Sequence, residues 1–327
     1  MSETEAETVD RPGGAERAAA PADGEVEVLT PRDVPLGGPR AMAVRRTLPQ
    51  RSRPLIGAWC FVDHYGPDDV AGTGGMRVAP HPHTGLQTVS WLFSGEIEHR
   101  DSLGSHALVR PGELNLMTGG HGISHAEFST GGTTVLHGVQ LWVALPEEHR
   151  HTARDFRHHV PEPVRTGDAG IKVFLGELAG SVSPVRTFTP LLGAEITLAP
   201  HASVTLAVDP GFEHGLLVDA GDVRLAGTAL RPAELGYVPP GRDTLTLVNE
   251  SAAPARTVLL GGAPFEEEIV MWWNFVGRSH DDIVRARQDW ADATDRFGVV
   301  EGCPAARLPA PALPNATIRP RRNPPRR

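Results

Sequence analysis

A short stretch of this chain occurs twice. The segment LVRPGEL at residues 108–114 returns as ALRPAEL at residues 229–235, 121 positions later. The turn before it, SGEI at residues 94–97, is echoed by AGDV at residues 220–223, at an offset of 126. Separate segments that repeat at nearly the same offset indicate one structural unit present in two copies. We therefore expect two copies of one fold within the 327 residues.

Each copy has the sequence pattern of short strands. Glycine and proline are frequent, with 36 and 30 residues, and they punctuate the chain at about the 8–12-residue spacing of sandwiches and barrels. Between the turns, side chains alternate: Val89, Trp91 and Phe93 fall on one face of a strand, with Thr88 and Ser90 on the other. The prediction is an all-β fold of barrels or sandwiches.

One helix is predicted near the end of the second copy. Ser279 and Asp282 have the spacing of a capping box, in which each side chain bonds a backbone N–H of the other residue. Ile283, Ala286 and Trp290 follow at helical spacing and give one apolar stripe.

The domain boundaries follow from composition. Residues 1–25 are acidic and almost free of large apolar side chains, and residues 297–327 are rich in proline and arginine. We expect both segments to be disordered tails, because they cannot bury enough surface to offset the entropy of ordering. Residues 26–165 then form the N-terminal domain and residues 166–296 the C-terminal domain.

The net charge of −9 is unevenly distributed. Residues 1–25 carry −5 and residues 307–327 carry +6, which leaves −10 on the body between them. Because affinity for nucleic acid depends largely on Lys and Arg that neutralise phosphates, an acidic body argues against direct nucleic-acid binding.

Two cysteines, Cys60 and Cys303, cannot form a disulfide framework. No apolar run approaches the ~20 residues of a membrane span, and the first ten residues, MSETEAETVD, lack the apolar core of a signal peptide. We expect a reduced, cytoplasmic protein that does not enter a membrane.

Two short motifs predict a metal site. His81 and His83 lie two residues apart, and His125 and Glu127 repeat that spacing 42 residues later. Residues at this spacing on a strand share a face, so the three imidazoles and the carboxylate would converge. Such a donor set suits Fe, Zn, Cu or Ni. The alternative is chance pairing among 15 histidines, as we assume for His149 and His151 in a polar, arginine-rich stretch.

The remaining histidines are not expected to bind the metal. The second copy has no comparable cluster at the corresponding positions, so we expect the metal in the first domain alone. His121, in the glycine-rich segment GGHG, is expected to orient a ligand or to contact substrate. His64, His99 and His137 are expected to have structural roles.

These motifs resemble the pirin family of the cupin superfamily. The similar segments are RTLP (46–49), FVDHYGP (61–67), HPHTGLQTVSWLFSGEIEHRDSLG (81–104), RPGELNLMTGGHGISHAE (110–127) and GGAPFEEEIVMWWNFVGRS (261–279). The resemblance covers roughly residues 30–295. It implies a bicupin, with two antiparallel β-barrels of the jelly-roll type.

The resemblance also implies one divalent metal, Fe(II) first among the choices, in the N-terminal barrel on His81, His83, His125 and Glu127. Two positions depart from the family. Gln87 stands where pirins often have Glu, and His121 where they often have Arg. We expect both residues to lie near the metal or the substrate. Gln87 can form a hydrogen bond but cannot act as a base, and His121 would affect substrate preference more than metal binding.

Two functions follow from the resemblance. The first is a quercetinase-type dioxygenase that cleaves a flavonol, or a similar enol-bearing aromatic, with O2, with Glu127 as the catalytic acceptor of the substrate proton. The second is a non-enzymatic, redox-responsive metal protein that regulates a protein partner. The family resemblance suggests a monomer.

Overall fold

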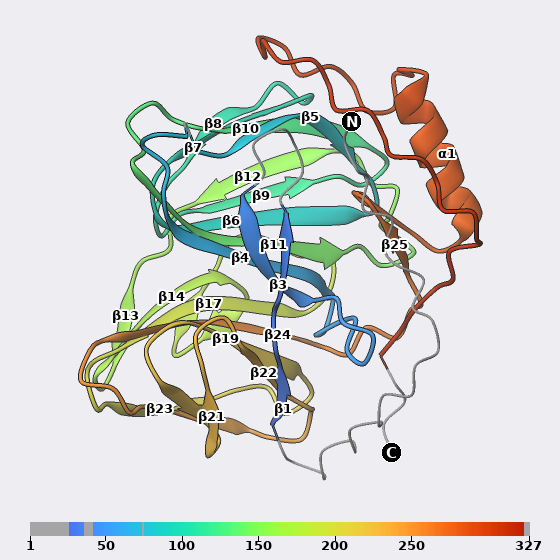
Figure 1. Ribbon diagram of the computed structural model, residues 1–327. Coiled ribbons are helices and arrows are strands. Elements are labelled where there is room, and N and C mark those ends of the chain that lie inside the picture. The colour runs from blue at the N-terminus through green and yellow to red at the C-terminus, as the bar shows by residue number, and fades with distance from the viewer. Residues whose placement is uncertain (1–25, 36–41, 74, 324–327) are drawn as a thin grey trace.

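In the part of the chain that the computed structural model describes, residues 26–35, 42–73 and 75–323, the predicted all-β fold with a short C-terminal helix is confirmed. The N-terminal domain has two facing sheets (Figure 1). The larger contains, in spatial order, β12 (Asp155–His159), β9 (Leu114–Thr118), β6 (Leu86–Ser94), β11 (Val135–Ala144), β4 (Trp59–Asp69), β3 (Ala43–Leu48) and β2 (Arg32–Pro35). The smaller contains β5 (Arg77–His83), β10 (Ile123–Ser129), β7 (Ile97–Asp101) and β8 (His106–Val109).

The C-terminal domain repeats this arrangement. Its larger sheet contains β1 (Glu27–Leu29), β22 (Leu235–Val238), β19 (Glu213–Ala220), β24 (Ala255–Gly262), β17 (Leu191–Leu198), β14 (Ala169–Leu175) and β13 (Val164–Thr166). Its smaller sheet contains β18 (Ser203–Ala207), β23 (Thr244–Asn249), β20 (Val223–Leu225) and β21 (Thr228–Leu230). Two hairpins complete the strands, β15 (Glu177–Leu178) with β16 (Ser181–Val182) and β25 (Val270–Trp272) with β26 (Phe275–Gly277).

The repeated sequence segment occupies the same place in both domains. Residues 108–114 run from the end of β8 through a turn into β9, and residues 229–235 run from β21 into β22. β9 lies beside β6, and β22 lies beside β19, at the same position in the two larger sheets. The two copies predicted from the repeat are therefore two barrels of the same topology.

The first described strand crosses to the other domain. Residues 27–29, in β1, pair with β22, so that Glu27 lies opposite Tyr237 in the C-terminal sheet. Arg53 then ties this strand back to the N-terminal domain through an ion pair with Glu27 at 2.8 Å. A boundary at residue 26 would have placed β1 with the first barrel. Instead, β1 pairs with the otherwise unpaired edge of β22 in the second barrel. In the first barrel, β12 covers the equivalent edge of β9.

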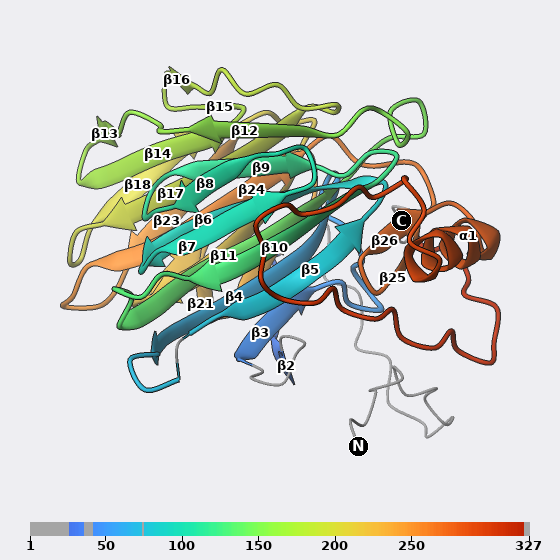
Figure 2. The ribbon, with the colours of Figure 1, turned by 90° about the horizontal axis from the view of Figure 1, so that it is seen from above.

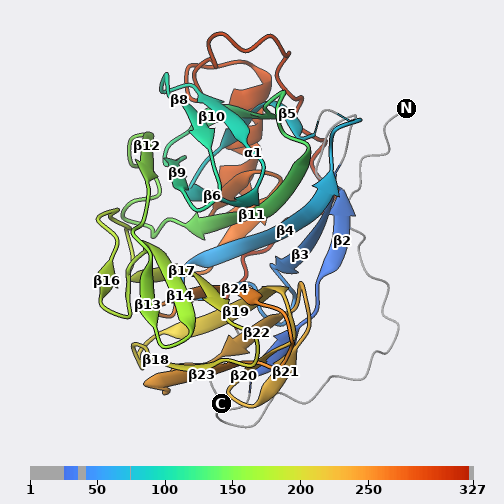
Figure 3. The same ribbon diagram turned by 90° about the vertical axis from the view of Figure 1, so that its left-hand side faces the viewer.

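The two larger sheets face each other across one continuous apolar core (Figure 3). Trp91 of β6 is fully buried, lies 4.7 Å from Phe174 between ring centroids, and donates Nε1–H to Glu195 at 2.8 Å. The face of β6 that carries Trp91 therefore points to the second barrel, which explains the apolar side chains predicted on it. The opposite face, with Ser90, is also buried, because it lines the interior of the first barrel.

The helix α1 (His280–Ala291) forms as the sequence predicts. Ser279 is its N-cap, and the reciprocal bonds of the capping box with Asp282 are both present. Ile283, Ala286 and Trp290 are its buried residues, and they pack with Phe275 and other apolar side chains beside the hairpin β25–β26. Among the described residues, no helix has the length and apolar character to cross a bilayer.

The segment after the helix is held against the barrels. Residues 297–323, which we call the C-terminal strap, have almost no regular secondary structure but make specific contacts. Leu308 N–H donates to Pro80 O at 2.8 Å, Trp290 Nε1–H donates to Leu308 O at 2.8 Å, and Asn323 donates to Leu55 O at 3.0 Å. Figure 2 shows this red segment passing over β5 and β10. The composition predicts a disordered tail, and the structure differs from this prediction for residues 297–323. The difference arises because backbone contacts to distant strands leave no local sequence pattern.

Candidate metal centre

The two predicted motifs lie on adjacent antiparallel strands. β5 carries His81 and His83, and β10 carries His125 and Glu127. The register places His125 directly opposite His81. A β-bulge then shifts the register, so that Glu127 lies opposite Val78. The period-2 geometry of the strands therefore brings the three imidazoles together and sets Glu127 slightly apart.

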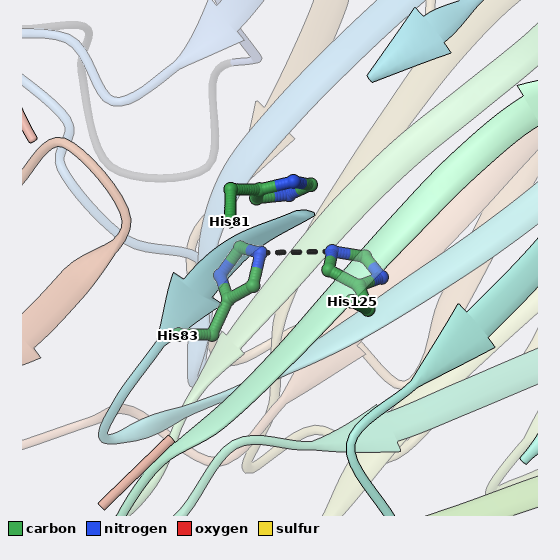
Figure 4. Close-up of side chains that lie close together, drawn as sticks. All are labelled: His81, His83 and His125. Carbon is green, nitrogen blue, oxygen red and sulfur yellow. Dashed lines mark hydrogen bonds between the residues drawn. The ribbon is translucent and has the colours of Figure 1, made fainter. Parts of the chain in front are cut away.

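The three imidazoles form a buried cluster (Figure 4). One nitrogen of each ring lies within 4.8 Å of the others, and Nε2 of His83 lies 3.0 Å from Nε2 of His125. His81 is 7% exposed, His83 2% and His125 1%. Nitrogen atoms that share a tetrahedral metal ion lie roughly 3.4 Å apart, so this spacing is close to that of a bound set.

The environment keeps these rings neutral. Burial lowers the pKa of His81 to about 4, and burial together with the neighbouring imidazoles holds the pKa values of His83 and His125 well below their usual range. His81 Nδ1–H donates to Ala79 O at 2.9 Å, which leaves the lone pair of this neutral ring on Nε2. Metal ions bind the neutral imidazole, so the protonation state fits a metal site.

Hydrogen bonding alone does not satisfy the cluster. One N–H···N bond can join His83 and His125, but His83 Nδ1 is buried without a partner in the described part of the chain. Lone pairs that converge in a dry interior are a destabilising arrangement unless a cation occupies the space between them. Three imidazole nitrogens are the donor set of Fe, Zn, Cu or Ni sites, so the residues present fit the implied metal.

Glu127 belongs to a second group of potential ligands that shares His125 with the three imidazoles. A carboxylate oxygen of Glu127 lies within 4.8 Å of a ring nitrogen of His99 and of His125. The carboxylate also accepts a hydrogen bond from Ser90 Oγ at 3.3 Å. The side chain is 6% exposed. Burial raises the pKa of Glu127 above its usual value, partly opposed by His99 and Ser90.

His99, expected to be structural, belongs to this cluster. It lies on β7, which pairs with β10 on the side away from β5, and its Nδ1 is 3.4 Å from Nδ1 of His125. Its Nε2 lies 3.1 Å from Asp101 Oδ2. The sequence held a signal, since His99 and Asp101 have the same two-residue spacing as the other motifs, but the pairing of β7 with β10 was not predictable from it.

The described contacts of His121 and Gln87 are with residues other than the three imidazoles. His121 lines a separate pocket of about 350 Å³ with His151, Arg150, Arg285 and Arg296, at the outer side of the turn that follows His83. Burial and Arg296 lower the pKa of His121. Gln87 is buried and donates from Nε2 to Thr118 Oγ1 at 2.9 Å. No hydrogen bond in the described residues joins Gln87 or His121 to the cluster.

A second cluster lies between the two barrels. His64, His137 and Asp219 offer ligand atoms within 4.8 Å of one another, and all three side chains are buried. Arg256 donates Nε–H to Asp219 Oδ2 at 2.7 Å, and its guanidinium lies 4.2 Å from the Phe93 ring centroid. Arg256 balances the charge of the Asp219 carboxylate, so this cluster is an ion pair flanked by two imidazoles, in which His64 Nδ1 is buried without a hydrogen-bond partner among the described residues.

Comparisons with known proteins agree with this geometry. The family model Pirin matches residues 41–143, and the Pirin C-terminal cupin domain matches residues 193–298. A Pseudomonas aeruginosa protein named "Putative quercetin 2,3-dioxygenase" is 45% identical over 88% of this chain and 90% of its own length. A pirin-like protein of Caulobacter vibrioides is 36% identical over 76% of this chain and 87% of its own.

A solved structure extends the likeness to the whole fold. The crystal structure of quercetin 2,3-dioxygenase from Acinetobacter baumannii superposes with a TM-score of 0.86 at 36% identity, covering 90% of this chain and 98% of that one. Both barrels are therefore shared with that protein. Two cupin barrels, the imidazole cluster in the first of them and these matches together show that the chain belongs to the pirin family.

Proposed function

We propose that this protein is an Fe(II)-dependent dioxygenase of the quercetinase type, which opens a flavonol or a similar enol-bearing aromatic with O2. The observation that carries the proposal is the buried cluster of three neutral imidazoles with a carboxylate beside it. The names of the relatives from Pseudomonas aeruginosa and Acinetobacter baumannii support the reaction class. The reaction with O2 favours a redox-active ion among the metals that imidazoles bind.

His81, His83 and His125 hold the ion, and Glu127 is the fourth candidate ligand. A bound metal supplies Lewis acidity to an enol oxygen and a redox partner to O2. The neutral state of the rings, held by burial, leaves their lone pairs available at neutral pH. The protein also excludes bulk water from the site, because each of these four side chains is at most 7% exposed.

Glu127 accepts the proton of the substrate hydroxyl. Its raised pKa, caused by burial, makes the carboxylate a stronger base than an exposed glutamate, and a base with a pKa nearer the working pH transfers protons more effectively. Ser90 Oγ contacts Oε1 at 3.3 Å, and its single hydrogen has Gln140 Oε1, at 3.0 Å, as a second acceptor. Oε2 then remains for the substrate.

Aromatic side chains beside the imidazole cluster are a second argument for an aromatic substrate. The Trp142 ring lies edge-on to His83, with centroids 5.4 Å apart, and is stacked on Phe61 at 4.0 Å. The Arg46 guanidinium lies 4.3 Å from the Phe61 centroid, and Arg46 pairs with the buried Asp63. These rings make the surroundings of the cluster apolar, which suits an aromatic ligand better than a charged one.

The test is oxygen uptake with detection of CO. The protein is purified without oxygen, loaded with Fe(II) and given quercetin, with His81→Ala as the matched control. We expect uptake and CO release by the loaded protein and neither in the variant. Absence of both from protein with a full complement of iron would overturn the dioxygenase proposal in favour of the redox-responsive regulator. A search for partners in both oxidation states of iron would then follow.

A further inference from the structure

A line of three side chains runs outward from the imidazole cluster. It begins at His125, continues through His99 and ends at Asp101. All three are at most 2% exposed. The strand ladder sets the positions, because Asp101 lies opposite His125 and His99 lies opposite Glu127 in the pairing of β7 with β10.

Asp101 is fixed at the outer end. Its Oδ1 accepts backbone N–H bonds from Leu103 and Ser105, both at 2.9 Å. Its Oδ2 lies 3.1 Å from His99 Nε2. An ionised carboxylate is only an acceptor, so the hydrogen in this contact belongs to His99 Nε2.

This contact sets the tautomer of His99 in its neutral form. A neutral imidazole with its hydrogen on Nε2 has its lone pair on Nδ1. His99 Nδ1 lies 3.4 Å from His125 Nδ1, so His99 is the acceptor and His125 Nδ1–H the donor. The ring of His99 is also stacked on Phe156, with centroids 4.8 Å apart and planes 27° from parallel, which restricts its rotation.

The same reasoning reaches the inner nitrogen. With its hydrogen on Nδ1, neutral His125 has its lone pair on Nε2, which is the atom that lies 3.0 Å from His83 Nε2. We propose that His99 and Asp101 are positioning residues that hold His125 in the tautomer able to bind a metal through Nε2. This inference rests on the proposed metal centre and adds two residues to it.

The test uses three variants that differ in hydrogen bonding. His99→Leu removes the acceptor. His99→Asn restores an oxygen acceptor near the position of Nδ1. Asp101→Asn can still accept from Leu103 and Ser105 but presents an amide N–H to His99, which favours the opposite tautomer along the whole line. Glu98→Gln, on the same strand and paired with Arg100 at the surface, is the control.

The first readout is the affinity for Co(II), followed by its visible absorption. We expect about 10–100-fold weaker binding in His99→Leu and Asp101→Asn, which is the usual effect of losing the partner of a ligating histidine. His99→Asn and Glu98→Gln should bind within a few-fold of the wild type. The second readout is the ring ¹⁵N chemical shifts of His125, which should show Nδ1–H in the wild type and a changed tautomer in Asp101→Asn.

The outcomes distinguish the positioning role of His99 and Asp101 from the metal centre itself. Wild-type affinity in both His99→Leu and Asp101→Asn would overturn the positioning role while the metal centre stands. So would a His99→Asn variant as weak as His99→Leu, because it would make His99 itself a ligand. A wild-type protein that binds no Co(II) would overturn the metal centre and the inference together. Circular dichroism and thermal unfolding of the apo variants confirm that each is folded.

Discussion

His64 Nε2 in the first barrel lies 2.7 Å from Asp219 Oδ1 in the second. His137 Nε2 lies 2.5 Å from the same oxygen, and Arg256 donates to Oδ2 at 2.7 Å. Burial alone would raise the pKa of Asp219, but hydrogen bonds from His137 and His64 and the charge of Arg256 hold it well below its usual range. The carboxylate therefore links side chains of the two domains.

The first prediction concerns this link. Asp219→Asn should lower the free energy of unfolding by about 3 kcal/mol, because it removes the charged acceptor that two buried imidazoles and the half-buried Arg256 share. Urea unfolding at neutral pH measures the change. Asp222→Asn, at an exposed position three residues away, is the control and should change stability by less than about 0.5 kcal/mol. Equal stability of the two variants would contradict the role of Asp219.

The second prediction concerns pH and His214. This residue is 1% exposed, neither ring nitrogen has a hydrogen-bond partner among the described residues, and burial lowers its pKa from 6.5 to about 4. The unfolded chain therefore binds a proton between pH 6.5 and 4 that the native protein excludes. Stability falls as pH falls through this window, by up to about 3 kcal/mol from this residue.

His214→Leu should remove that contribution. Because the substitution also removes two buried polar atoms without partners, we expect it to stabilise the protein by about 1–3 kcal/mol at pH 7, and by more at pH 5. Urea unfolding of both proteins at the two pH values is the measurement. A difference that does not grow toward acid would show that His214 is not held neutral in the native protein.

The third prediction separates binding from proton transfer at Glu127. Glu127→Gln should retain part of its metal, since three imidazoles remain, but lose at least about 100-fold in turnover, because an amide cannot accept the substrate proton. Metal content and oxygen uptake are measured on the same sample. Turnover equal to the wild type at matched iron content would remove Glu127 from the proposed mechanism.

The fourth prediction concerns the C-terminal strap. Removal of residues 303–327 deletes Leu308, which bonds both Trp290 and the strand residue Pro80 next to His81. We expect a lower melting temperature and faster loss of bound metal to a chelator. The substitutions Arg319→Ser and Arg322→Ser, both at exposed positions of the strap, should leave both quantities unchanged. A truncated protein as stable as the full chain would show that the strap contacts carry little energy.

The sequence predicts the local part of this structure well. The repeat locates both barrels, the capping box locates α1, and the two-residue spacing places His81 and His83 on one face of β5. Each of these features depends on neighbouring residues along the chain. The resemblance to pirins rests on the same segments.

What could not be predicted depends on contacts between distant residues. The pairing of β7 with β10 brings His99 to His125, and the bulge after His125 sets Glu127 apart from His83. Asp219 meets His64 only because the two barrels dock through their larger sheets. The strap bonds β5 through backbone atoms, which have no sequence signature.

The most direct test of the account is the metal stoichiometry of the anaerobically loaded protein. Fe(II) is titrated into the wild type and into His83→Ala, His125→Ala and His64→Ala. We predict a single tightly bound iron per chain, lost in the first two variants and retained in His64→Ala, because His64 belongs to the ion pair between the barrels. Iron bound by His83→Ala and His125→Ala as tightly as by the wild type, or lost only in His64→Ala, would contradict the metal centre.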